Sequence, residues 1–130
     1  MNDTSSQSVA LGVGIGRVAY GLGMAVAPRL GLALFGVRDV AGPLVFLTRL
    51  FGIRDAVLGA GAVIALTNES DSAAGWVAAG AVADTADFVT ATVFSEDLDS
   101  MAPVAAGIAA VAGLAGWVSL PGVRRSTRRY

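Results

Sequence analysis

The stretch MAPVAAGIAAVAGLAGWVSLPGV, residues Met101–Val123, contains no charged side chain over its 23 residues. A helix needs about 20 successive apolar residues to cross a bilayer. A helix on the surface of a soluble protein would show a polar face, and this stretch has none. The segment therefore predicts a membrane-spanning helix.

Three further segments are apolar and long enough to cross a bilayer: Val9–Ala27, Pro43–Thr67 and Ala73–Phe94. Polar turns at residues 68–72 and 95–100 separate the last three spans, whereas Leu30–Val37 is apolar but too short to cross. We predict an all-α fold, an integral membrane four-helix bundle with spans near 9–27, 43–67, 73–94 and 101–123. Residues 1–130 then form a single transmembrane domain, with a polar N-terminal tail (1–8) and a basic C-terminal tail (124–130).

The composition excludes several classes of chemistry. Of the 130 residues, 55% are hydrophobic and 15% are charged, and there is no His, Cys or Lys. Sites of the Cys/His metal, thiol, Schiff-base and Ser-His-Asp types are therefore excluded, and we predict no catalytic residue, cofactor or metal. A net charge of −1 with 7% aromatic residues gives no footprint for nucleic acid. Gly14-x-Gly16-x-x-Ala19 matches a loose dinucleotide fingerprint, but no alternation of strands and helices surrounds it.

Six charged residues interrupt the predicted spans, and they are the informative feature of the chain. Each costs about 2.5–3.5 kcal/mol at a helix centre on insertion scales, so a buried, mutually paired polar network is expected. The predicted members are Arg17, Arg49, Arg54, Asp55, Asp84 and Asp87.

Depth along the helices predicts the pairing within this network. The second and third spans are joined by a short turn and should be antiparallel, which sets Arg54 level with Asp84 at about 1.5 Å per residue. Arg49 then comes within reach of Asp87. Asp55 lies about 100° around its helix from Arg54, so Arg17 of the first span is its expected partner. Such a network either fixes the helix register or forms a functional site at the bilayer midplane, and both readings stay open.

Small residues spaced four apart allow helices to approach closely in lipid. Such pairs occur in every predicted span: Gly12/Gly16, Ala56/Ala60, Ala79/Ala83, Ala109/Gly113 and Ala112/Gly116. They predict tight packing within one bundle, with a homodimer seam on the last span as the alternative.

The motif Arg49-x-Phe51-Gly52-x-Arg54-Asp55-x-x-Leu58-Gly59, followed by Asp84-x-x-Asp87, resembles a family of uncharacterised small membrane proteins common in actinobacteria. The resemblance covers roughly residues 10 to 120. It implies a four-helix integral membrane protein, and it implies no activity.

The arginine-rich tail predicts the orientation, because basic segments stay on the cytoplasmic side. We expect a multi-pass protein of the bacterial cytoplasmic membrane with both termini in the cytoplasm. Arg29 and Arg38 would then lie outside, against this bias, and a three-span topology with the first segment outside the membrane is the alternative.

Two hypotheses for the function follow. The first is a structural or accessory subunit of a membrane assembly, or a homo-oligomer, whose partners are the lipid bilayer and other membrane subunits or further copies of itself. The second is a small transporter or channel in which the Arg/Asp network lines a polar site. An enzyme acting through the Arg/Asp cluster ranks third.

Overall fold

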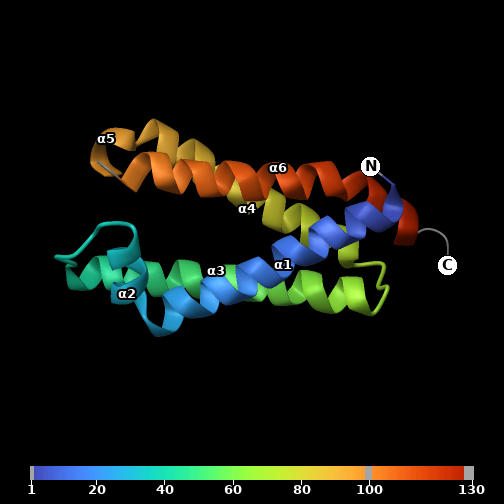
Figure 1. Ribbon diagram of the computed structural model, residues 1–130, viewed down its shortest axis with the longest axis horizontal. Coiled ribbons are helices and arrows are strands. Elements are labelled where there is room, and N and C mark those ends of the chain that lie inside the picture. The colour runs from blue at the N-terminus through green and yellow to red at the C-terminus, as the bar shows by residue number, and fades with distance from the viewer. Residues whose placement is uncertain (1, 99–100, 128–130) are drawn as a thin grey trace.

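The computed structural model describes residues 2–98 and 101–127, and within these residues all regular secondary structure is helical (Figure 1). The helices are α1 (Asp3–Val26), α2 (Pro28–Leu34), α3 (Gly42–Thr67), α4 (Ala73–Val93), α5 (Ser95–Leu98) and α6 (Ala102–Thr127). The predicted all-α fold is confirmed. Three of the helices, α1, α3 and α6, are long and apolar enough to cross a membrane, which is compatible with a multi-pass membrane protein. The shorter α4, which carries Asp84 and Asp87, is not among these three.

The first and last helices extend into both predicted tails. The first helix starts at Asp3, because the Asn2 side chain accepts a hydrogen bond of 2.7 Å from the Ser5 amide and caps it. Most of the predicted polar tail is thus helical, and α6 likewise runs on through Arg124 and Arg125. The first helix ends before Pro28, which disfavours helical backbone in the preceding residue.

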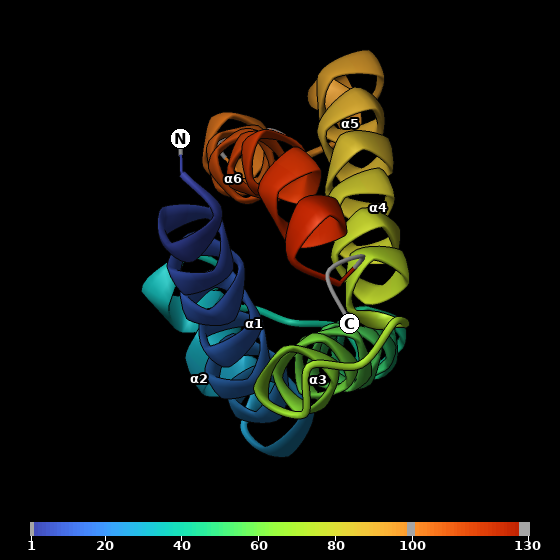
Figure 2. The same ribbon diagram turned by 90° about the vertical axis from the view of Figure 1, so that its right-hand side faces the viewer.

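The four long helices form two closely packed pairs, α1 with α3 and α4 with α6. Contact between α3 and α4 is less extensive, although a short turn joins them. Figure 1 shows the two pairs converging toward the end that holds both termini and spreading toward the end that holds α2 and α5. The view along the bundle in Figure 2 shows the four helices at the corners of a quadrilateral.

Glycine brings α1 and α3 together. A Cβ on Gly21 would overlap the backbone of Gly52 and Ala56, and a Cβ on Gly59 would lie 2.5 Å from the Gly14 carbonyl oxygen. Bare backbone therefore faces bare backbone, as in closely packed membrane helices. The predicted Gly12/Gly16 pair takes no part in this close contact, because a Cβ on either residue would meet no atom within 4 Å.

The small residues predicted as a homodimer seam on α6 pack inside the chain. A Cβ on Gly116 would lie 2.9 Å from the Ala81 Cβ of α4, and a Cβ on Gly113 would lie 3.2 Å from the Asp84 Cβ. Ala109 is also buried. This face of α6 is thus occupied by α4, as the prediction of packing within one bundle requires.

Small side chains fill the interior, and large apolar ones cover the outside. Ala10, Ala62, Ala65 and Ala81 are buried in the core. Exposed large apolar residues occur on all four long helices and include Ile15, Leu22, Phe46, Ile64, Val82, Val111 and Leu114. Many large apolar side chains on the outside are what a lipid environment favours and water does not.

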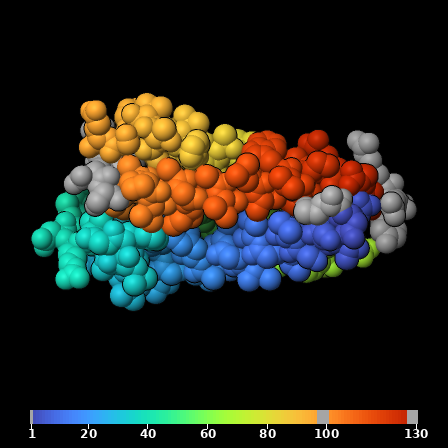
Figure 3. Space-filling view, turned by 45° about the horizontal axis from the view of Figure 1, so that its top comes forward, coloured from blue at the N-terminus to red at the C-terminus, as the bar shows by residue number. Residues whose placement is uncertain are grey.

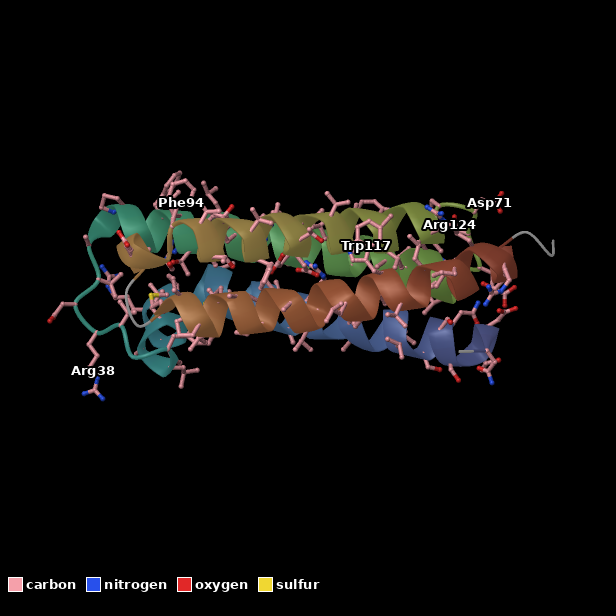
Figure 4. All side chains as sticks on the ribbon, turned by 90° about the horizontal axis from the view of Figure 1, so that it is seen from above. Arg38, Asp71, Phe94, Trp117 and Arg124 are labelled. Carbon is pink, nitrogen blue, oxygen red and sulfur yellow. The ribbon has the colours of Figure 1, made fainter. Side chains whose placement is uncertain are left out.

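Contacts between α1 and α6 hold the two ends of the chain together. Arg125 Nε donates a 2.9 Å hydrogen bond to Asp3 Oδ1, and the buried Ser6 lies where a Cβ on Gly122 would be. Figure 4 shows Asp71 of the α3–α4 turn and Arg124 at this same end, with Arg38 at the opposite end.

Candidate functional site

Arg17 joins three helices in the middle of the bundle. Its side chain is 8% exposed, and Nη1 donates a 2.9 Å hydrogen bond to Asp55 Oδ1 of α3. Nη2 donates to the Gly80 carbonyl oxygen at 2.8 Å and forms an ion pair with Asp84 of α4. The guanidinium group is thus surrounded by three acceptors from two other helices.

A second arginine extends the network on the other side of Asp55. Arg54 donates to both carboxylate oxygens of Asp87, from Nη1 at 3.1 Å and from Nη2 at 2.5 Å. Its Nη2 also lies 3.3 Å from Asp55 Oδ1, and its guanidinium carbon lies 5.2 Å from the ring centre of Phe51. Because both arginines contact Asp55, the five charged residues form one network that links α1, α3 and α4.

Residues without a side chain make room for these groups. A Cβ on Gly59 would lie 2.8 Å from the Arg17 Cβ, and a Cβ on Gly80 would lie 3.4 Å from the Arg17 Nε. The packing glycines therefore position the charged network as well as the helices.

The structure brings five of the six predicted network residues together. The predicted Arg17–Asp55 pair is present. The predicted Arg54–Asp84 and Arg49–Asp87 pairs are wrong, because Asp84 faces Arg17 and Arg54 takes Asp87. Arg49 is exposed and forms no ion pair with any described residue.

The physical reason is the position of α1. The predicted pairing assumes that α3 and α4 pack mainly against each other. Instead, α3 packs mainly on α1 and α4 mainly on α6, and Arg17 enters the space between the pairs. Arg17 pairs with Asp84, and Arg54 therefore pairs with Asp87, one helical turn further along α4.

A groove of about 550 Å³ runs between α1 and α6 and reaches this network. Its lining residues are Val13, Gly16, Arg17 and Tyr20 of α1, Gly107, Ile108, Val111, Ala112 and Ala115 of α6, and Asp55 and Asp84. Its walls are therefore apolar and its charged groups come from the network. The lining residue Val111 is 71% exposed, so the groove opens to the outside of the bundle. Figure 3 shows α6 lying along α1 on this face.

Two smaller cavities share lining residues with the groove. A cavity of about 60 Å³ shares Tyr20 and Ile108 with it and continues to Phe35 and Met101, near the α2 and α5 end. On the other side of Arg17, a cavity of about 20 Å³ reaches Ala10 and Trp76. The groove was not predicted from the sequence. The available signal was Tyr20, three residues after Arg17 and hence on the same face of the helix.

Each carboxylate of the network is engaged by at least one arginine. Across residues 2–98 and 101–127, no group of three or more acidic side chains is arranged to hold a metal ion. The arrangement is therefore a groove with apolar walls that ends on the paired charged residues of the network.

Comparison with protein families, curated proteins and solved structures finds no match to this chain.

Proposed function

We propose that this chain is a four-helix integral membrane protein in which α4 also crosses the bilayer. The two acidic residues of α4 contact arginines of α1 and α3, and this pairing lowers the cost of placing them in lipid. In this arrangement α1, α3, α4 and α6 span a bacterial cytoplasmic membrane. The arginines at the end of α6 support cytoplasmic termini.

We further propose that the protein is a small transporter that takes a membrane-soluble ligand into the groove between α1 and α6. The observation that carries this proposal is that a groove of about 550 Å³ with apolar walls ends on Arg17, Asp55 and Asp84. Ligand sites are typically clefts of about 300–1,000 Å³ with mostly apolar walls and a few convergent polar groups. Asp55 and Asp84 lie near the middle of α3 and α4, so a ligand would be held near the bilayer midplane.

Native mass spectrometry of the gently extracted protein tests this proposal. We expect a bound small molecule that is lost in Gly16→Phe, because Gly16 lines the groove and a Cβ there meets no other atom. Gly12→Phe is the matched control, since this residue lies one turn away on α1, is equally open and does not line the groove. An adduct that survives Gly16→Phe, or no adduct at all in the wild-type protein, would contradict the proposal.

The accessory-subunit or homo-oligomer hypothesis is the second candidate function. It is favoured by a stripe of exposed small residues along one face of α1, namely Gly12, Gly16, Ala19 and Gly23. Such a stripe lets a neighbouring membrane helix approach closely. Extraction of the tagged protein would then yield a stable larger complex, and Gly12→Phe would dissociate it without removing a ligand. A monomer that retains a small molecule would favour the transporter instead.

A further inference from the structure

The charges around the groove do not balance. Two guanidinium groups, Arg17 and Arg54, face three carboxylates, those of Asp55, Asp84 and Asp87. The helix on the other side of the groove adds no compensating charge, because α6 is uncharged from Ala102 to Val123. Tyr20, the remaining titratable group that lines the groove, is neutral at pH 7. The network therefore carries one surplus negative charge when every carboxylate is ionised.

The sixth charged residue of the spans does not supply the missing positive charge. Arg49 is exposed and forms no ion pair with the described residues. An uncompensated charge in apolar surroundings is strongly unfavourable. Protonation of one carboxylate, or a cationic ligand beside it, would neutralise the surplus charge of these five contacting residues.

The surplus charge is accessible from the groove. Asp55 and Asp84, whose side chains are 13% and 8% exposed, both line it. The only cation that lines the groove among the described residues is Arg17, and its guanidinium group is already held by Asp55, Asp84 and the Gly80 carbonyl. An anionic ligand would have to displace these acceptors and would raise the surplus to two negative charges.

We infer that the groove binds a lipophilic organic monocation in exchange for a proton. The apolar body packs against Val13, Ile108 and Val111, and the positive group lies beside Asp55 and Asp84. One cation enters the site and one proton leaves to water, so the charge of the site stays constant. This inference rests on the proposed transport function, which it deepens by naming the class of ligand.

The test compares two probes of the same shape and opposite charge, tetraphenylphosphonium and tetraphenylborate, on the purified full chain in detergent. Isothermal titration calorimetry gives both affinities, and repeating it in buffers of different ionisation enthalpy counts the protons released. We expect the cation to bind at least about tenfold tighter than the anion and to release up to one proton. Its affinity should fall as the pH is lowered, because protons then compete for the same carboxylates.

Variants locate the binding. Asp84→Asn should weaken binding of the cation by at least about tenfold, and Gly16→Phe should abolish it while Gly12→Phe retains it. If Asp84→Asn does not fold, the Gly16→Phe and Gly12→Phe pair and the pH dependence of the wild-type protein still decide the question.

The outcomes separate the two levels of the proposal. If tetraphenylborate binds as tightly as the cation, and Gly16→Phe blocks it, the charge class is wrong and the groove remains a ligand site. If the cation binds without proton release or pH dependence, the proposed exchange of the cation for a proton is wrong. If neither probe binds, and Gly16→Phe does not remove a small molecule that copurifies with the wild-type protein, both the inference and the proposed function are overturned.

Discussion

Arg17 places one guanidinium group against acceptors from two other helices, and its side chain is 8% exposed. Replacing it with Met keeps an unbranched side chain but leaves Asp55 and Asp84 without their main partner. Removal of one member of a buried ion pair typically costs about 3–5 kcal/mol. We predict a loss of this size for Arg17→Met, measured as a lower midpoint of thermal unfolding in detergent.

Arg49 provides the matched control for this substitution, because it also lies in a predicted span but is exposed and unpaired among the described residues. Arg49→Met should not lower stability, because it breaks no ion pair and removes an unpaired charge from a span. Equal effects of the two substitutions would show that Arg17 does not hold the helices together.

Arg54 tests whether the shape of the guanidinium group matters. It contacts both oxygens of Asp87 and one oxygen of Asp55, a forked geometry that the single ammonium group of Lys cannot reproduce. We predict that Arg54→Lys lowers stability by about 1–2 kcal/mol although the charge is kept. An unchanged unfolding midpoint for Arg54→Lys would mean that charge alone suffices at this position.

At the scale of helices, the contact between α1 and α3 depends on bare backbone. Gly21→Ala would place a Cβ against the backbone of Gly52 and Ala56 and force the helices apart. Overpacking of this kind costs about 1–3 kcal/mol. Gly12→Ala, on the same helix in open space, should instead gain up to about 1 kcal/mol from helix propensity. Chemical or thermal unfolding of the two variants measures this difference, and a stability loss shared by both would contradict it.

Helix positions follow from the sequence, whereas helix rotations do not. Hydropathy and prolines placed the four long helices within a few residues, except that the start of α1 at Asp3 depends on the Asn2 cap. The network residues were identifiable because charge is costly in lipid, and five of the six came together. Their pairing depends on which helices are neighbours, and depth alone does not encode this. A usable signal was present: Gly14 and Gly21 have the same seven-residue spacing as Gly52 and Gly59, and these four residues form the α1–α3 contact.

For the whole molecule, the decisive question is whether α4 crosses the bilayer. The chain contains no Cys, so single-cysteine variants can be labelled without background. We predict that Ser95→Cys and Asp39→Cys react with a membrane-impermeant maleimide in intact cells, and that Asp71→Cys reacts only after lysis. Labelling of Ser95→Cys and Asp71→Cys from the same side would mean that α4 does not span, and an accessible Asn2→Cys would place the N-terminus outside.

The long-range contacts of Arg17 also set how late during synthesis the charged network can form. Asp55 lies 38 residues later in the chain and Gly80 lies 63 residues later. At synthesis rates of about 5–20 residues per second, roughly 3–13 seconds pass before Gly80 follows Arg17. During that interval α1 carries an uncompensated arginine, worth about 2.5–3.5 kcal/mol against insertion. In the proposed four-span arrangement, this cost is relieved only after α3 and α4 have been made and Asp55 and Gly80 can reach Arg17.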